Sequence, residues 1–182
     1  MKDGDELEIG GLKIKALHTP CHTRGHILYF VTADGAEEEA EKGEECGFHF
    51  VRKLKRVLFT GDTIFVGGCG RFFEGEAAEM LAAMDRVQEL PLDTSLFCGH
   101  EYTVSNLRFG LSVEPHSQPI QHKLDQALAL RRDARPTLPS SLHEELQINV
   151  FMRCRELAIH KVAGSDDPVE CMRFLRETKN KA

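Results

Sequence analysis

Apolar positions in the first hundred residues follow the pattern of short β-strands. In LKIKAL (residues 12–17), apolar residues alternate with Lys13 and Lys15, which is the two-residue period of a half-exposed strand. Three further apolar runs end in turn-forming residues: HILYFVT (26–32), RVLFTGD (56–62) and TSLFCGH (94–100). The pattern predicts strands joined by glycine-bearing loops.

A helical period is found at residues 76–90 and again beyond Tyr102. In the first stretch the apolar residues recur every three or four positions: Ala77, Met80, Leu81, Met84, Val87 and Leu90. Helical segments are also predicted at 104–115, 119–133, 140–146 and 167–179. The third opens with Ser141 and Glu144 at the spacing of a capping box. We therefore expect an α/β (α+β) fold with a strand-rich part, 1–103, and an all-helical part, 104–182.

Composition and charge narrow the class of partner. Of 182 residues, 41% are hydrophobic and 29% are charged, as in soluble globular proteins, and no apolar run is long enough to span a bilayer. The net charge of −6 disfavours a nucleic-acid or anionic-membrane partner, because phosphate binding relies on clustered Lys and Arg. We expect no nucleic acid and no membrane among the partners.

Three smaller features complete this picture. The acidic run 37–45 is typical of a solvated surface insertion. The six cysteines are scattered without a CxxC pair, which predicts free thiols. The opening MKDGDELEIGGLKIK lacks the apolar core of a secretory signal, so a cytoplasmic location is expected, with mitochondria open if a presequence exists upstream.

Three of the predicted strands are followed by a turn that carries a potential metal ligand. His22 follows Pro20, Asp62 follows Gly61, and His100 follows Gly99. If the strands share one sheet, these loops can converge at one edge, and His, Asp and His suit a zinc or iron ion. Each loop alone also fits an ordinary turn with a surface or packing side chain.

Longer motifs around these residues resemble a known family. TPCHTRGH, LFTGDTIFVGGCGRFFEG and FCGHEYTVSNLRF, in this order, closely resemble glyoxalase II, the hydroxyacylglutathione hydrolase of the metallo-β-lactamase superfamily. The segments ARPTLPSSLHEELQINVFMR and DPVECMRFLRETK look like its helical tail. The resemblance implies the second half of a metallo-β-lactamase αββα sandwich (1–103), followed by an all-helical, glutathione-binding C-terminal domain (104–182).

The resemblance also implies roles for the three candidate ligands. His22 matches a ligand of the first metal of a two-metal site, Asp62 the carboxylate that bridges both metals, and His100 a ligand of the second. The metal pair, zinc or iron in the complete site, would supply hydroxide as the nucleophile, so no side chain is expected to act as one. The remaining histidines are expected to be surface or packing residues: His18, His26, His49, His116, His122, His143 and His160.

Residues that would contact a glutathione thioester follow in the same way. They are Arg71, Phe73, His100, Tyr102, Arg176 and Lys179. Arg176 and Lys179 are three residues apart, so they would share a helix face and could meet one carboxylate. Phe73 stands where well-known members carry tyrosine, which removes a hydroxyl hydrogen bond and predicts weaker binding.

One family signature, His-x-His-x-Asp-His, does not occur in this sequence. It supplies four ligands in the family, and the strands that carry it would cover one sheet face, so an exposed apolar face is expected here. The function implied is hydrolysis of S-(2-hydroxyacyl)glutathione thioesters, such as S-D-lactoylglutathione, to a 2-hydroxy acid and glutathione. The alternative is a catalytically incompetent fragment or a protein that binds glutathione conjugates. A complementing chain could supply the missing half-domain.

Overall fold

The computed structural model describes residues 1–33 and 55–181. The predicted acidic insertion at 37–45, together with Cys46 and His49, lies outside these ranges. The described strands are β1 (Glu6–Ile9), β2 (Leu12–His18), β3 (Ile27–Ala33), β4 (Arg56–Gly61), β5 (Ile64–Phe65), β6 (Gly68–Cys69), β7 (Ser95–Cys98) and β8 (Ser140–Ser141). The described helices are α2 (Ala77–Gln88), α3 (Thr103–Val113), α4 (Gln118–Arg132), α5 (Leu142–Ile148), α6 (Leu157–Ala163) and α7 (Pro168–Lys181).

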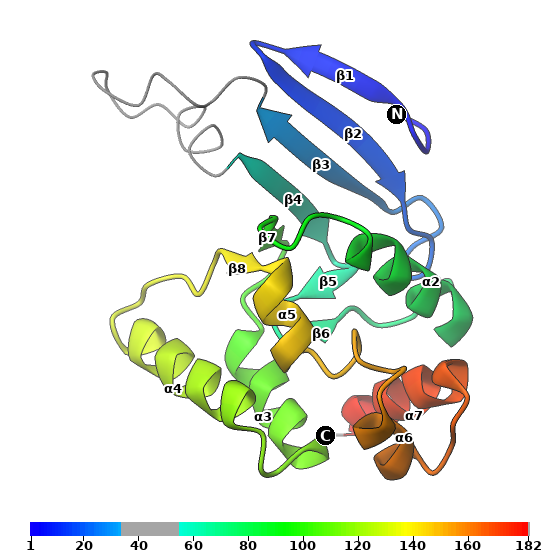
Figure 1. Ribbon diagram of the computed structural model, residues 1–182, viewed down its shortest axis with the longest axis vertical. Coiled ribbons are helices and arrows are strands. Elements are labelled where there is room, and N and C mark those ends of the chain that lie inside the picture. The colour runs from blue at the N-terminus through cyan, green and yellow to red at the C-terminus, as the bar shows by residue number, and fades with distance from the viewer. Residues whose placement is uncertain (34–54, 182) are drawn as a thin grey trace.

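Six strands form one sheet in the order β1-β2-β3-β4-β7-β8, and β5 pairs with β6 in a separate hairpin. Neighbouring strands of the sheet are antiparallel, except that β4 and β7 are parallel. The four strands predicted from apolar runs are therefore confirmed. Figure 1 shows β1 to β4 at one end of the molecule and α3, α4, α6 and α7 at the other.

The two faces of the sheet differ in how they are buried. On one face Leu17, Leu28 and Leu58 join the main hydrophobic core, which also takes in Met80 and Met84 of α2. On the opposite face Tyr29 and Phe59 are paired in register and exposed, beside a second small core of Leu12, Val31 and Val57. Tyr29 and Phe59 are thus exposed, as expected for this face, whereas Leu12, Val31 and Val57 on the same face are buried.

Helix α2 confirms the helical period found at 76–90, and its start is fixed by local chemistry. The Glu76 side chain accepts from the Glu79 backbone, and the Glu79 carboxylate accepts from Glu76 N at 2.9 Å, which forms a capping box. At α5 only half of the predicted box forms. Ser141 Oγ accepts from Glu144 N at 3.2 Å, whereas the Glu144 carboxylate turns to Lys123 Nζ at 2.6 Å.

Contrary to the expectation, the second part of the chain is not all-helical, because it contains the two-residue strand β8; the rest of its regular structure is helical. It is joined to the first part in two ways. Strand β8 lies within it and pairs with β7, so the helix predicted from residue 140 begins two residues later. The main core also runs without a break from Leu28 in the sheet to Leu107 in α3 and Met172 in α7. The predicted boundary between residues 103 and 104 falls one residue after α3 begins, and the division into two domains there stays a prediction.

The sequence pattern did not predict β1, β5, β6, β8 or α6. For β1 and α6 the reason is exposure. All four residues of β1 are exposed, so the strand has no buried face to mark it. Helix α6 buries only Ile159 and ends at Gly164, whose positive φ of 70° suits a glycine C-cap. The cysteines of the described residues, Cys21, Cys69, Cys98, Cys154 and Cys171, are free thiols, as predicted. None of the described helices is long and apolar enough to cross a membrane.

Candidate functional site

The loops that carry His22, Asp62 and His100 meet at one edge of the sheet. Strand β2 is antiparallel to β3, and β3 is antiparallel to β4, so β2, β4 and β7 all end at the same edge. His22 Nε2 lies 3.3 Å from Asp62 Oδ2, and His100 Nε2 lies 3.4 Å from the same oxygen. The predicted convergence is therefore observed, and both histidines face a single carboxylate oxygen.

The ring of His22 is oriented by the backbone of a second loop. Its Nδ1 lies 3.0 Å from the carbonyl oxygen of Arg71. Because a carbonyl oxygen only accepts, Nδ1–H donates to it, which leaves Nε2 as the ring nitrogen that faces Asp62. A histidine ligand of a metal is commonly held in this way, with its other ring nitrogen donating to a backbone carbonyl.

His26, expected to be a packing residue, supports the backbone beside Asp62. Asp62 N donates to His26 Nε2 at 3.0 Å, so Nδ1 carries the hydrogen and lies 3.0 Å from Thr63 Oγ1. Burial lowers the pKa of His26, and the neighbouring His22 lowers it further. A neutral imidazole is the form that can accept from Asp62. His18 instead bonds the Arg24 carbonyl oxygen across its loop, at 2.7 Å from Nε2.

Two glycines allow the loops to approach this closely. A Cβ at Gly70 would lie 2.0 Å from the Asp62 carbonyl oxygen, and one at Gly99 would lie 2.6 Å from Asp62 Oδ1. Side chains at either position would push the loops apart. The glycines of the GCG and CGH motifs are thus required for steric reasons, because a larger residue at either position would clash with Asp62.

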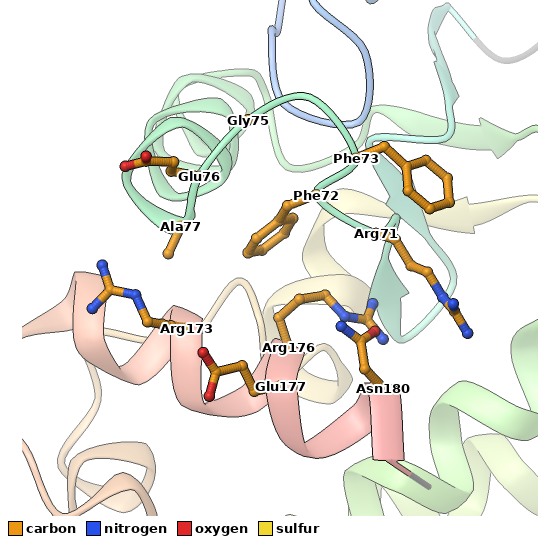
Figure 2. Close-up of a pocket in the computed structure, with 10 residues that line it drawn as sticks. All are labelled: Arg71, Phe72, Phe73, Gly75, Glu76, Ala77, Arg173, Arg176, Glu177 and Asn180. Atoms are coloured by element: carbon orange, nitrogen blue, oxygen red, sulfur yellow. The ribbon is translucent and has the colours of Figure 1, made fainter.

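A pocket of about 520 Å³ adjoins this cluster, between the segment 71–77 and helix α7. Figure 2 shows Arg71, Arg176 and Asn180 on one side of it, and Glu76 and Arg173 on the other. Phe73 also lines the pocket, is 67% exposed, and has its ring 5.0 Å from that of His22. Three of the predicted substrate contacts, Arg71, Phe73 and Arg176, are therefore gathered in one pocket beside His22.

Two other predicted substrate contacts, Tyr102 and Lys179, are not among the residues that line this pocket. The Tyr102 ring stacks on His100 with centroids 5.3 Å apart, and the side chain is half exposed. Lys179 donates to Asn106 Oδ1 and lies 5.4 Å from the ring centroid of Phe109. Burial lowers the pKa of Lys179 to about 8.

Arg176 is buried, and only some of its side-chain N–H groups have hydrogen-bond partners. It donates from Nη1 to the Cys69 carbonyl oxygen at 3.0 Å, and its guanidinium lies 5.5 Å from the Phe151 ring centroid. Its Nε is buried and has no hydrogen-bond partner among the residues that the structure describes. Lys179 lies 5.9 Å from the same Phe151 ring, so the predicted shared face is confirmed.

Sequence reasoning missed a buried carboxylate, Glu145. Its side chain is fully buried, and burial raises its pKa to about 7. The sequence does hold a sign of this burial. Glu145 lies three residues after the buried Leu142 and three before the buried Ile148, which places it on the apolar face of α5. A glutamate at such a position needs hydrogen-bond donors from other elements.

The donor set suits a metal but does not form a complete site. Two ligands of one tetrahedral ion with bonds of about 2.1 Å lie about 3.4 Å apart, which matches the two His–Asp separations. Imidazole nitrogen and carboxylate oxygen are ligands that zinc and iron accept. Within residues 1–33 and 55–181, however, no group of three or more His, Cys, Asp or Glu side chains has the geometry to enclose an ion.

Comparison with known proteins shows which protein families this chain resembles. Residues 101–182 match the model for the hydroxyacylglutathione hydrolase C-terminus, and residues 44–100 match that for the metallo-beta-lactamase superfamily. A cytoplasmic hydroxyacylglutathione hydrolase of Arabidopsis thaliana is 43% identical over 98% of this chain and 63% of its own length. A hydroxyacylglutathione hydrolase-like protein of Gallus gallus is 41% identical over 97% of this chain and 57% of its own.

The fold agrees with these matches. A metallo-β-lactamase of Staphylococcus aureus superposes with a TM-score of 0.52 at 21% identity, over 98% of this chain and 43% of its own. The chain thus spans about three fifths of the length of the curated relatives it matches. The chain is therefore similar to the hydroxyacylglutathione hydrolases, the glyoxalase II family of the metallo-β-lactamase superfamily, both in its family-model matches and in its named relatives.

Proposed function

We propose that this chain acts in the hydrolysis of S-(2-hydroxyacyl)glutathione thioesters, such as S-D-lactoylglutathione, to a 2-hydroxy acid and glutathione. The observation that carries the proposal is the convergence of His22 and His100 on Asp62 Oδ2, beside a pocket lined by Arg71 and Arg176. Relatives named hydroxyacylglutathione hydrolase support the reaction class.

In this proposal His22, Asp62 and His100 would hold divalent ions, zinc or iron. When bound, such ions polarise a carbonyl and lower the pKa of water at neutral pH. The metallo-β-lactamase family match supports metal binding. The chain itself prepares these ligands, because the Arg71 carbonyl fixes the tautomer of His22 and His26 fixes the backbone of Asp62.

The pocket provides the contacts for the glutathione part of the substrate. Arg71 and Arg176 offer positive charge to its carboxylates, and Phe73 offers an aromatic surface next to His22. Tyr102, stacked on His100, can present its hydroxyl to the same ligand. Lys179 can reach a carboxylate once its bond to Asn106 is shared or exchanged. We also propose a cytoplasmic location, which the name of the Arabidopsis thaliana relative supports.

The first test is steady-state hydrolysis of S-D-lactoylglutathione by the purified chain, loaded with zinc or with iron, followed by the thiol released. A His100→Ala variant, purified in parallel, reveals any contaminating host hydrolase. Turnover that is lost in this variant supports the proposal. Equal turnover in both preparations would contradict it.

The alternative, a catalytically incompetent fragment or a glutathione-conjugate-binding protein, is not favoured by the comparisons, whose named relatives are hydrolases. It is tested by calorimetric titration with S-hexylglutathione. Binding without turnover would favour this alternative.

A complementing chain that supplies further metal ligands forms a separate part of the proposal. Its test adds a polypeptide carrying the His-x-His-x-Asp-His segment of a relative to the metal-loaded chain. Turnover that depends on the concentration of the added polypeptide would support complementation, and no change in turnover would oppose it.

A further inference from the structure

The hairpin formed by β5 and β6 connects the candidate metal ligand Asp62 to Arg71. Phe65 pairs with Gly68 across its turn, and the hairpin returns the chain so that Gly70 packs against the Asp62 carbonyl. The next residue, Arg71, offers the carbonyl that accepts from His22 Nδ1. The position of this hairpin therefore sets both Asp62 and the orientation of His22.

Glu145 binds the turn of the hairpin from helix α5. Its Oε2 accepts from Gly67 N at 2.9 Å and from Asn149 Nδ2 at 2.9 Å, and its Oε1 accepts from Ser140 Oγ at 2.6 Å. All three contacts are buried, and the Glu145 side chain is 0% exposed. A buried acceptor in this position satisfies a backbone N–H that water does not reach.

Two asparagines complete the attachment of the turn. Asn149 Nδ2 also lies 3.0 Å from the Gly68 carbonyl oxygen, and Asn106 Nδ2 donates to the Val66 carbonyl oxygen at 2.9 Å. The backbone of residues 66–68 is thus held by side chains from the helical part of the chain, with Glu145 as the acceptor for its N–H group.

We infer that Glu145 is a positioning residue of the proposed hydrolysis: by holding Gly67 N it fixes the hairpin that sets Asp62 and His22. This inference rests on the proposed function. Glu145 does not act on the substrate directly, because its contacts are Gly67, Ser140 and Asn149. Its role requires an acceptor of the right shape, whereas its charge is not required.

The structure offers a variant that keeps this acceptor without the charge. In Glu145→Gln, the amide oxygen can accept from Gly67 N and Asn149, and the amide NH₂ can donate to Ser140 Oγ. Ser140 Oγ lies 3.0 Å from Glu144 Oε2, so its hydroxyl can turn to donate there. Glu145→Leu keeps the approximate size of the side chain but removes every acceptor.

The experiment compares kcat and KM for S-D-lactoylglutathione across Glu145→Gln, Glu145→Leu and a control, Leu142→Ala. Leu142 is fully buried on the same helix, so its truncation destabilises α5 without removing any of the hydrogen bonds to the turn described above. We expect Glu145→Leu to lower kcat/KM at least tenfold. We expect Glu145→Gln to stay within about threefold of the parent, and Leu142→Ala likewise at a temperature where it is folded.

A second measurement does not depend on turnover. Nitrogen NMR of the His22 ring reports whether Nδ1 carries the hydrogen, and hydrogen exchange reports protection of the Gly67 amide. We expect Glu145→Leu to lose both signatures, and Glu145→Gln and Leu142→Ala to keep them. If the parent chain neither binds nor hydrolyses the thioester, the proposed function fails, while these signatures still test the hold of Glu145 on the hairpin.

The inference is overturned if folded Glu145→Leu keeps the parent kcat/KM and the His22 signature, or if Leu142→Ala loses them equally. Should Glu145→Leu fail to fold, Asn149→Ala takes its place, since it releases the Gly68 carbonyl of the same turn. A normal His22 signature in folded Asn149→Ala would then count against the inference.

Discussion

His22 and Arg71 are joined by a hydrogen bond of 3.0 Å from the Nδ1–H of the imidazole to the Arg71 carbonyl oxygen. The bond links the candidate metal cluster to the candidate substrate pocket, because the Arg71 side chain lines that pocket. A residue expected to bind substrate through its side chain therefore orients a candidate metal ligand through its backbone.

Asp62 is predicted to be needed for metal binding and for turnover. Asp62→Asn keeps the shape of the side chain but removes the charge that would hold two cations. We expect at least a hundredfold loss of kcat and less bound zinc per chain, with little change in thermal unfolding. Metal analysis, thioester hydrolysis and calorimetry check this. Asp93→Asn, which alters a surface ion pair with Arg56, is the matched control and should keep full activity.

Phe73→Tyr is predicted to strengthen binding of the glutathione part. Phe73 is exposed and lines the pocket next to His22, so a hydroxyl added to its ring lies at the pocket surface. One additional hydrogen bond is worth about 1 kcal/mol, which corresponds to a fall in Kd for S-hexylglutathione of about fivefold. Titration calorimetry measures it, with Phe59→Tyr on the far sheet face as the control. A Kd that is unchanged or higher would contradict the prediction.

Binding of the glutathione carboxylate is predicted to weaken as the pH rises through about 8. Burial lowers the pKa of Lys179 to about 8, and only the protonated form attracts a carboxylate. In the parent chain we expect the Kd of S-hexylglutathione to be flat below pH 7 and to rise above pH 8. Lys179→Met should bind more weakly at pH 7 and lose this rise. A persistent rise in Lys179→Met would assign the titration to another group.

The free energy of unfolding is predicted to fall between pH 4.5 and about 7 through Glu145. Burial raises its pKa from 4.5 to about 7, so the folded state binds the proton more tightly than the unfolded state does. The resulting stability is fully present below pH 4.5 and is lost as the pH rises through about 7. The difference corresponds to about 3 kcal/mol at most.

Urea unfolding at a series of pH values measures this contribution. Glu145→Gln has no proton to release, so its curve should lack the decline that distinguishes the parent over this range. Glu144→Gln, which changes the neighbouring carboxylate that is only partly buried, serves as the control and should retain the decline. Parallel curves for the parent and Glu145→Gln would show that Glu145 does not titrate there.

Much of the architecture was determined by the sequence alone. The alternation around Lys13 and Lys15 and the apolar runs before Asp62 and His100 mark β2, β4 and β7, because a strand that is buried on one or both faces must repeat that burial in its residues. The helical period from Ala77 onward marks α2 for the same reason. The turn motifs and the family resemblance also placed the three candidate ligands in loops that do converge.

Only the tertiary structure decided how these residues are held. Residues far apart in the chain, such as Gly67 and Glu145, meet through a hydrogen bond that no local period records. The partner of His22 Nδ1 is a backbone carbonyl, and any residue type supplies one, so its identity follows from the path of the β5–β6 hairpin. Likewise the burial that shifts the pKa of Lys179 and Glu145 comes from neighbours on other elements. Local sequence sets which element each residue occupies, whereas desolvation and long-range hydrogen bonds set what its side chain can do.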